Sequence, residues 1–487
     1  MPREAAASLP EPVFSEVTPA PDPSTFTVTP DDQRLYQGIE DLLKKDVVGF
    51  DRSRAADQDV FPLERALGSR GPAARAAIQA AGRMVFHAVG DSGAASTRSF
   101  PAEIKVTDAL CADFHAAAAA DRPAFLFHLG DLVYNFGESA YYYDQFYDPF
   151  RDYAAPIFAV PGNHDSFVVP NTPAGSEPLR VFSRNFCAQS PVVTPEAGSL
   201  HRTAMTQPGV YFSLDAPFVR IIGLFSNALE DPGVISSENG RWGSVPDYQL
   251  DFLRAQLRRV TSERYAGALI LAVHHPPFSW APANAAPSGR HGGSPAMLAQ
   301  VDAICLEENV YPHVVLSGHA HNYQRFTRKL DFGGKQLSVP FVVCGSGGHN
   351  VNPLVSARGG TGASEPADGA DASHLDSSTV VRGLGLVLDR HDQANYGYLK
   401  VIADARSLTV EFHPVTPHAA PLDSLTVDLA AHTSRTVGAA RTREPARRSA
   451  KGGKAARATS AARATKATKA TRAAKAARGQ RPRRNPR

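Results

Sequence analysis

A pair of histidines stands in the stretch Gly318-His319-Ala320-His321, directly after the apolar run Val314-Val315-Leu316. Such a run predicts a buried strand, so both histidines are expected on the loop that leaves its carboxyl end. Two imidazoles at i and i+2 on one loop can face the same crevice and bind a metal ion through a neutral nitrogen. Taken alone the pair is a weak signal, because surface and core histidines occur at this spacing by chance.

Four further apolar, strand-like runs also end in residues that can ligate a metal. These are Asp91 after 85–90, Asp131 after 125–130, Asn163-His164-Asp165 after 157–162, and His274-His275 after 269–273. In layered α/β folds, ligands bind in the crevice outside the carboxyl ends of the strands. Five such coincidences are far more specific than any one of them, and together they predict a single metal site.

The segments between these runs carry apolar residues at helical spacing, over 250–260 and over 297–305. Strands that alternate with helices favour a layered α/β fold. Further strands are expected at 341–344, 396–402 and 408–412, completing a second sheet. The prediction is therefore two stacked mixed sheets flanked by helices, with all five ligand-bearing loops at one edge.

The net charge of +3 conceals a strong asymmetry along the chain. Residues 433–487 hold 18 of the 51 Lys and Arg but only one, Glu444, of the 48 Asp and Glu. The remaining 33 basic and 47 acidic residues give residues 1–432 a net charge of −14, against +17 for the tail. Since 43% of residues are hydrophobic, the rest of the chain is able to bury a sizeable core.

The four cysteines, Cys111, Cys187, Cys305 and Cys344, show no paired spacing. This argues against a disulfide framework and a thiolate zinc site, and it fits a reducing compartment. The first thirty residues contain no apolar stretch of signal-peptide length, and no run approaches the ~18 apolar residues of a membrane span. We therefore expect a cytoplasmic protein without a transmembrane segment.

As a set, the five stretches resemble the signature blocks of calcineurin-like metallophosphoesterases. The matching blocks are Gly90-Asp91-Ser92-Gly93, Gly130-Asp131-Leu132-Val133-Tyr134, Gly162-Asn163-His164-Asp165, His274-His275-Pro276 and Gly318-His319-Ala320-His321. The resemblance spans roughly residues 84–413, and it implies a four-layer α/β/β/α sandwich of two mixed sheets. Gly93 stands where the wider superfamily carries a histidine ligand, and Tyr134 where the purple acid phosphatase branch carries a tyrosinate. Both residues point to that branch.

The resemblance also implies which residues hold two metal ions. Asp91, Asp131, Tyr134 and His321 would hold the first ion. Asp131, Asn163, His274 and His319 would hold the second, with Asp131 bridging. Hard phenolate and carboxylate oxygens suit Fe(III) at the first position, and a divalent Fe, Mn or Zn is implied at the second. If Tyr134 only packs, the first ion loses a ligand and its preference for Fe(III).

Two further histidines resemble the family's substrate-contacting groups. His164 is similar to the histidine that contacts phosphate and assists departure of the leaving group, and His291 resembles another, although the spacing of its loop varies. His275 is the alternative to His274 as a ligand, but the family register favours His274. Asp165 is expected to accept hydrogen bonds that fix its loop. His87, His128, His313 and His349 match no ligand position.

The resemblance implies a phosphomonoesterase of purple acid phosphatase type, with a metal-bound hydroxide as nucleophile and a phosphorylated small molecule or nucleotide as substrate. One alternative keeps the fold and metals but makes the protein a phosphodiesterase or nucleotide pyrophosphatase. A second alternative is a nucleic-acid-associated protein whose phosphatase domain is vestigial.

Three regions are expected: an N-terminal extension at 1–80, partly disordered, a catalytic domain at 81–430, and a disordered tail rich in Lys, Arg and Ala at 431–487. The tail carries a cation about every third residue, as in Lys466-Ala467-Thr468-Lys469, with no large apolar side chain between. It cannot bury a core. It resembles the basic tails of bacterial linker-histone-like proteins, which implies that it binds nucleic acid or polyphosphate, with an anionic membrane surface as a further alternative.

Overall fold

The computed structural model of the protein describes residues 11–12, 23–30, 33–46, 49, 59–166, 179–280, 291–354, 365–415 and 420–437. The α-helices in these ranges are α1 (Gln33–Lys44), α2 (Leu63–Ala66), α3 (Gly71–Ala81), α4 (Phe100–Ala116), α5 (Arg180–Phe186), α6 (Tyr248–Ser262) and α7 (Pro295–Glu308). Within them no helix is long and apolar enough to cross a membrane.

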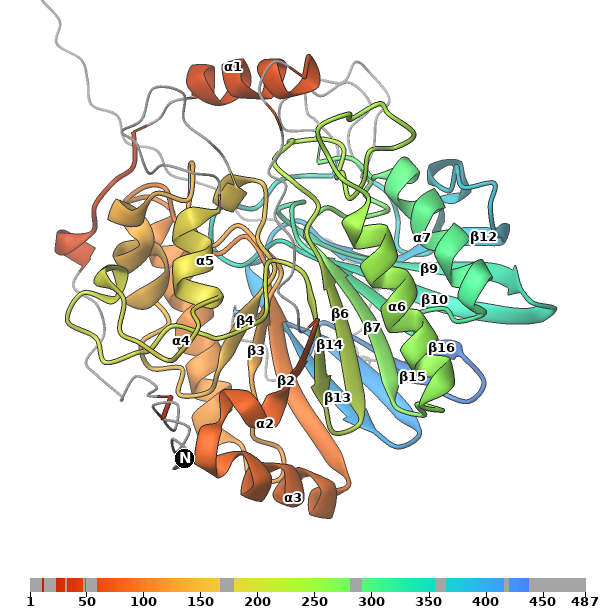
Figure 1. Ribbon diagram of the computed structural model, residues 1–487, viewed down its shortest axis with the longest axis horizontal. Coiled ribbons are helices and arrows are strands. Elements are labelled where there is room, and N and C mark those ends of the chain that lie inside the picture. Colours follow the sequence, from red (N-terminus) through yellow and green to blue (C-terminus); the bar gives the residue numbers. More distant parts are fainter. Residues whose placement is uncertain are drawn as a thin grey trace, which may run out of the picture. The chain divides into compact units, whose positions relative to one another are not determined.

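Two mixed sheets form the centre of the fold (Figure 1). The seven-stranded sheet has the order β16 (Thr433–Thr436), β15 (Asp423–Asp428), β14 (Ser407–Pro414), β13 (Gly397–Asp404), β2 (Arg83–Val89), β3 (Leu126–His128), β4 (Ile157–Ala159). The nine-stranded sheet has the order β1 (Val60–Pro62), β5 (Phe212–Ala216), β6 (Val219–Leu224), β7 (Ala268–Val273), β8 (Val314–Ser317), β10 (Lys335–Cys344), β9 (Tyr323–Phe332), β12 (Arg382–Asp392), β11 (Ala370–Asp371). Parallel pairing joins β2, β3 and β4 in one sheet and β6, β7, β8 and β10 in the other.

Strand β7 shows why the sheets stack face to face. Its six residues are all buried, and successive side chains point to opposite faces of the sheet. Ala268, Ile270 and Ala272 lie in an apolar cluster with residues of β2, β3 and β13 from the other sheet. The alternate residues, including Leu271, lie in a cluster with α6 and α7. A strand covered on both faces reads as a continuous apolar run, as its sequence Ala-Leu-Ile-Leu-Ala-Val does.

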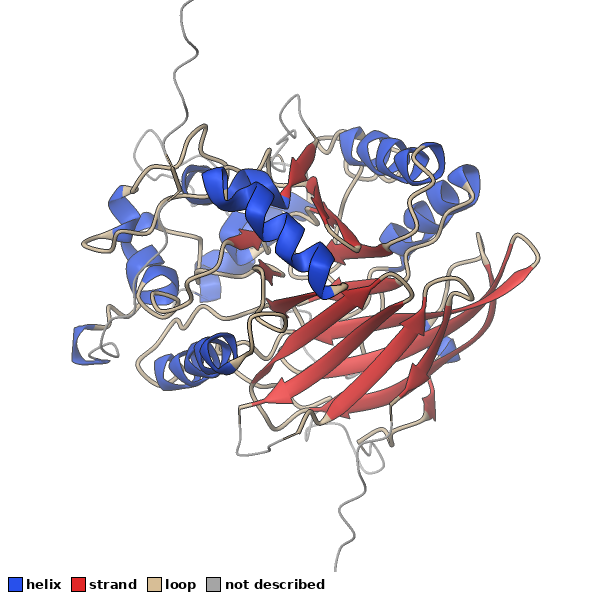
Figure 2. Cartoon of the chain, turned by 90° about the horizontal axis from the view of Figure 1, so that it is seen from below, coloured by secondary structure: helices blue, strands red, loops and turns tan. Residues whose placement is uncertain are grey.

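Helix α4 belongs to the same apolar cluster as the parallel strands of the seven-stranded sheet. Its buried Val106 and Leu110 lie there with Val89, Leu126 and Ile157. Helices α6 and α7 therefore lie on the outer face of the nine-stranded sheet, and α4 lies on the β2–β4 part of the other sheet. The outward residues of β14 are only half-buried, and no helix of the described residues lies over the long strands at the lower right of Figure 2. The predicted four-layer α/β fold is confirmed.

The predicted strands divide differently between the sheets. Residues 341–344 belong to β10 of the nine-stranded sheet, while 396–402 and 408–412 belong to β13 and β14 beside β2. The prediction that these three strands complete one second sheet is therefore wrong. The structure separates them because β10 continues the parallel series after β8, whereas β13 pairs antiparallel with β2.

Strands of both sheets lie outside the predicted catalytic domain, residues 81–430. In the expected N-terminal extension, β1 pairs with β5, and α1 packs through Tyr36, Ile39 and Leu43, which recur on one helical face. In the expected tail, β16 pairs with β15, so the seven-stranded sheet extends beyond residue 430. Such short pairings leave little periodic pattern in the sequence. From residue 438 on, the tail predicted at 431–487 lies outside the described residues.

Candidate metal centre

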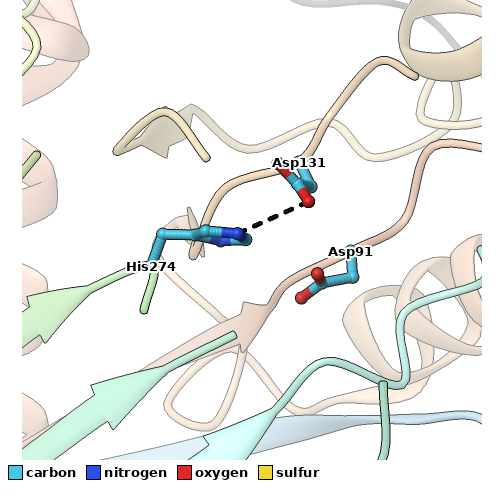
Figure 3. A group of neighbouring side chains, drawn as sticks. All are labelled: Asp91, Asp131 and His274. Carbon is cyan, nitrogen blue, oxygen red and sulfur yellow. Dashed lines mark ion pairs between the residues drawn. The ribbon is translucent and has the colours of Figure 1, made fainter. Parts of the chain in front are cut away.

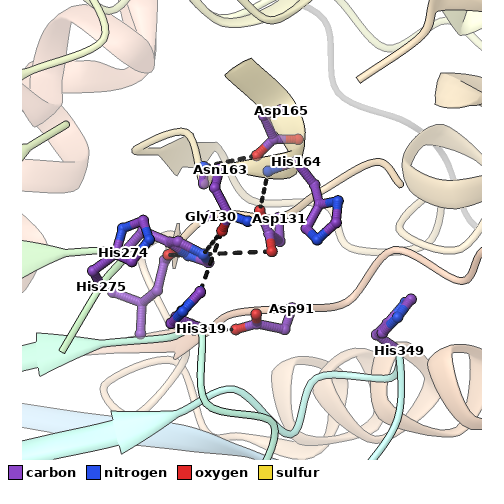
Figure 4. Close-up of polar contacts among 12 residues, drawn as sticks. Asp91, Gly130, Asp131, Asn163, His164, Asp165, His274, His275, His319 and His349 are labelled. Carbon is purple, nitrogen blue, oxygen red and sulfur yellow. Dashed lines mark hydrogen bonds and ion pairs between the residues drawn. The ribbon is translucent and has the colours of Figure 1, made fainter. Parts of the chain in front are cut away.

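Five strand ends bring their polar residues to one place, as the sequence predicts. Figure 4 shows most of these side chains facing one another. The residues are Asp91 after β2, Asp131 after β3, Asn163 after β4, His274 after β7, and His319 and His321 after β8. All six are buried, and even the most accessible, His321, exposes only 6% of its surface.

The backbone of these loops is unusual. Asp91, Asp131 and His319 adopt φ of 58°, 57° and 67°, a left-handed conformation that non-glycine residues rarely take and that is concentrated at functional sites. Gly318 precedes one of them, and a Cβ there would lie 2.6 Å from Asp91 Oδ2. A glycine is therefore needed for the histidine loop to approach the carboxylate.

One group of side chains able to donate a ligand atom to a metal ion, here called donors, gathers around Tyr134. Its hydroxyl donates a hydrogen bond to Asp131 Oδ2 at 3.0 Å and lies 3.3 Å from His321 Nε2. His321 Nε2 in turn lies 3.4 Å from Asp91 Oδ1. The structure thus brings together the four residues that the resemblance assigns to the first metal ion.

A second group gathers around Asn163. Its Oδ1 lies 2.9 Å from His274 Nε2 and 3.2 Å from His319 Nδ1. His274 Nε2 is also 3.4 Å from Asp131 Oδ2, so Asp131 borders both groups. Figure 3 shows Asp91, Asp131 and His274, whose ligand atoms all lie within 4.8 Å of one another. The four residues assigned to the second ion are therefore also neighbours.

The electrostatics of the centre favour a cation. Burial raises the pKa of the Asp131 carboxyl, but His274 and His164 lower it by more, so that it lies well below its usual range. Burial lowers the pKa of His274, and the Asp131 carboxylate raises it by more, to about 9. In contrast, burial and the surrounding histidines hold the pKa of His319 well below its ordinary value. His319 is therefore neutral, as a metal ligand must be.

Two of the three histidines, His274 and His321, are oriented by hydrogen bonds from outside the donor groups. His274 Nδ1 donates to the Leu129 carbonyl at 2.8 Å, and His321 Nδ1 bonds Asn350 Oδ1. His319 Nε2 is buried without a hydrogen-bond partner among the described residues, and Asp231 Oδ1 lies 3.8 Å from it. In all three histidines, the other imidazole nitrogen faces the centre. Histidines that bind metals are commonly held by such outer partners.

His164 and His291 both border the centre. The His164 ring lies 4.3 Å from the Tyr134 ring, and its Nδ1 donates to the Asn135 carbonyl at 2.9 Å. The His291 ring lies 4.8 Å from that of His319 and 4.7 Å from that of His321. His291 thus lies next to one residue of each donor group, His319 and His321.

The neighbouring candidates have other contacts. His275 binds Ser226 Oγ at 2.7 Å through Nδ1 and the Leu229 carbonyl at 2.6 Å through Nε2, so neither ring nitrogen is available to a metal, although the ring lies 4.2 Å from that of His319. Asp165 accepts hydrogen bonds from the backbone N–H groups of Leu132, Val133 and Gly162 at 3.0, 3.1 and 2.9 Å. It fixes two loops of the site, in agreement with the sequence analysis.

The four histidines that match no ligand position separate into two kinds. His87, His128 and His313 bond Asp113, Ser92 and the Leu429 carbonyl, respectively. His349 instead lies at the site, where its ring stacks on Tyr134 at 3.6 Å.

Three residues at the site were missed by the sequence analysis. Glu230 Oε1 lies 3.8 Å from His291 Nε2, and the neighbouring Asp231 approaches His319. Both residues follow the apolar strand β6, just as the other site residues follow apolar strands. The signal is weaker here because five residues separate the end of β6 from Glu230. Tyr36 reaches Asn163 from helix α1, and no pattern in the sequence indicates that contact.

One protein-family match agrees with this geometry. Residues 84–323 match the family described as calcineurin-like phosphoesterase. No curated protein matches the chain. A structure titled "GAP50 the anchor in the inner membrane complex of Plasmodium" is 12% identical with a TM-score of 0.42, over 69% of this chain and 86% of that one. A second, titled "Structure of PhoD", is 14% identical with a TM-score of 0.42, over 73% and 72%. Residues 84–323 therefore make up a calcineurin-like metallophosphoesterase domain, and the protein is a phosphoesterase.

Proposed function

We propose that the protein is a dinuclear metal-dependent hydrolase of phosphate monoesters, of the purple acid phosphatase type. The observation that carries this proposal is the position of Asp131 Oδ2, which lies 3.0 Å from the Tyr134 hydroxyl and 3.4 Å from His274 Nε2. A carboxylate shared in this way can bridge two ions about 3.5–4 Å apart.

The donor sets of the two groups differ in chemistry. Asp91, Asp131 and Tyr134 would offer three oxygens to the first ion, with His321 as its one nitrogen ligand. Oxygen-rich coordination with a phenolate suits Fe(III). At the second position His274 and His319 supply two nitrogens beside the oxygens of Asp131 and Asn163, a mixed set that suits divalent Fe, Mn or Zn.

When bound, the two ions would supply positive charge to the attacking and leaving oxygens of an in-line phosphoryl displacement and lower the pKa of water. The chain's own residues would orient the substrate. His164 is held by its Nδ1–H bond to Asn135, which leaves Nε2 to bind a phosphate oxygen or protonate the leaving group. His291 would contact the phosphate from the side of His319 and His321.

Two alternatives give different expectations. A phosphodiesterase or nucleotide pyrophosphatase would use the same donors on a substrate with two ester arms. A nucleic-acid-associated protein with a vestigial domain would have lost donors, whereas a side chain able to ligate is present at each assigned position.

The test is hydrolysis of a panel of phosphate monoesters and diesters by protein stripped with a chelator and reloaded with Fe together with Zn or Mn. We expect two ions per chain and faster turnover of monoesters. Faster turnover of diesters would support the alternative on the same fold. No turnover of any ester by protein that holds two ions would contradict the proposal.

Replacement of Asp131 by Asn is expected to lower the occupancy of both ions and abolish turnover, because a bridging ligand contacts both. Asp251, an exposed residue of α6, offers the matched control: Asp251→Asn should keep two ions and full turnover. Two ions and normal turnover in Asp131→Asn would reject Asp131 as the bridge.

A further inference from the structure

We infer that Tyr36 of helix α1 is a positioning residue for the second metal position, where its hydroxyl determines which way the Asn163 amide faces. This rests on the proposed dinuclear site. Tyr36 lies outside the region that matches the phosphoesterase family, residues 84–323, so the contact is made by this chain's N-terminal segment.

The contact is a directed chain of hydrogen bonds. The Asn163 Nδ2 group donates to the Tyr36 hydroxyl at 2.8 Å, and that hydroxyl donates to Glu230 Oε2 at 2.7 Å. All three side chains are buried, with 0%, 5% and 7% of their surfaces exposed for Asn163, Tyr36 and Glu230. A carboxylate only accepts, so the tyrosine proton is directed to Glu230 and the tyrosine oxygen accepts from Asn163.

The direction of these hydrogen bonds decides which atom of the Asn163 amide faces the second metal position. An asparagine amide carries an oxygen on one side and an NH2 group on the other, and only the oxygen ligates a cation. With Nδ2 bound to Tyr36, Oδ1 faces His274 Nε2 and His319 Nδ1 at 2.9 and 3.2 Å. The reverse orientation would direct the NH2 group at the metal. It would place the oxygen against the Tyr36 oxygen, whose proton is directed to Glu230, and 3.5 Å from the Glu230 carboxylate.

Helix α1 holds the tyrosine in place. Ile39 and Leu43 on the same face pack in an apolar cluster with Phe136, Leu229 and Trp242. The Tyr36 ring itself stacks on that of His164 at 4.9 Å, with 21° between the rings. The hydroxyl is therefore positioned by the packing of a helix as well as by its own hydrogen bonds.

The test uses Tyr36→Phe, which removes one oxygen and keeps the ring. Zinc or manganese is titrated into protein that already holds Fe at the first position. We expect the affinity for the second ion to fall about 10–100-fold, the usual effect of removing an outer partner of a metal ligand, with the first ion unchanged. Tyr142→Phe is the matched control, since that buried hydroxyl has no hydrogen-bond partner among the described residues. It should leave both affinities unchanged.

A double-mutant cycle separates positioning from a general loss of structure. In the Asn163→Ala background, Tyr36→Phe should change the affinity for the second ion little further, because the amide that it orients is absent. Equal losses in both backgrounds, or equal weakening of both ions, would overturn the inference. Wild-type affinity in Tyr36→Phe would also overturn it while leaving the proposed function intact. Failure of the wild-type protein to take up a second ion would instead contradict the proposed function.

Discussion

The two oxygens of Asp131 have different neighbours. Oδ1 accepts a hydrogen bond from the backbone N–H of His164 at 2.9 Å, while Oδ2 faces Tyr134 and His274. The loop that carries Asn163 and His164 therefore also orients the carboxylate between the two donor groups. A change in the conformation of that loop would reach both proposed metal positions through a single side chain.

Tyr134 offers a spectroscopic test of the first position. Burial raises the pKa of its phenol well above the ordinary value, and the Asp131 and Asp91 carboxylates raise it further. The proton can therefore leave only if a strong cation replaces it, as Fe(III) would. We expect the Fe-loaded protein to be coloured by phenolate-to-Fe(III) charge transfer, and Tyr134→Phe to lose this visible absorption band.

The control for this prediction is Tyr142→Phe, which also removes a buried phenol hydroxyl and should keep the colour. A fully active wild-type protein that is colourless and contains only Mn or Zn would place it among phosphoesterases without a tyrosinate ligand.

For single residues, the sequence predicts which side chains lie at the site better than it predicts which atoms they contact. Asp91 and His319 could be located because each follows a buried strand, whereas the choice between His274 and His275 needed a family resemblance. The structure supplies the physical reason: consecutive residues at a strand end diverge, and His275 turns to Ser226. Tyr36 could not be predicted, because its partner Asn163 lies 127 residues away on an unrelated element.

Among the elements, the strands that carry the site were the most predictable part of the fold. Each lies in a run of buried, mostly apolar residues in the sequence. Strand β1 ends in a proline, and the four residues of β16 are all polar, so neither leaves such a run. Both depend on pairing with strands far away in the sequence, which periodicity alone does not record.

A buried ion pair joins helix α7 to strand β9. Arg328 of β9 donates from Nη1 and Nη2 to the carboxylate of Asp302 on α7 at 2.9 Å each, and neither residue is exposed. Asp302 also accepts from the hydroxyls of Tyr311 and Ser378 at 2.7 Å. Removing Asp302 would leave the Arg328 guanidinium with fewer partners in the interior. Because Arg328 keeps a second ion pair with Asp376 at 2.8 Å, its charge is not left unpaired, and we expect Asp302→Ala to lower the free energy of unfolding by about 1.5–3 kcal/mol.

The measurement is denaturant unfolding followed by circular dichroism. Asp251 and Arg254 on α6 form an exposed ion pair of similar length, 2.8 Å, so Asp251→Ala is the matched control. It should cost about 0–1 kcal/mol, because solvent screens exposed pairs. Similar losses in the two variants would show that the buried pair contributes no more than a surface contact.

In the molecule as a whole, charge is divided along the chain. Residues 1–432 carry a net charge of −14 and residues 433–487 one of +17. The first part contains the phosphoesterase domain, and its acidic excess does not favour electrostatic attraction of anionic substrates. Positive charge for binding phosphate would then have to come from the metal ions, because burial and the neighbouring His321 lower the pKa of His291 to about 4. The basic segment would serve another purpose.

We propose that this basic segment binds polyanions, with nucleic acid as the leading candidate and polyphosphate or an anionic membrane surface behind it. Eighteen Lys and Arg against one acidic residue provide the charge, and alanine and threonine between them add no apolar anchor. Binding that neutralises phosphates releases counterions, so log K should fall with log salt by about 0.9 per phosphate contacted on duplex DNA. The test compares the full chain with one ending at Val437, which keeps β16 paired with β15, in a DNA shift assay across a salt series. We expect only the full chain to bind DNA, and to bind less at higher salt. Equal binding by both chains, or binding by the full chain that salt does not weaken, would show that the segment is not a polyanion-binding arm.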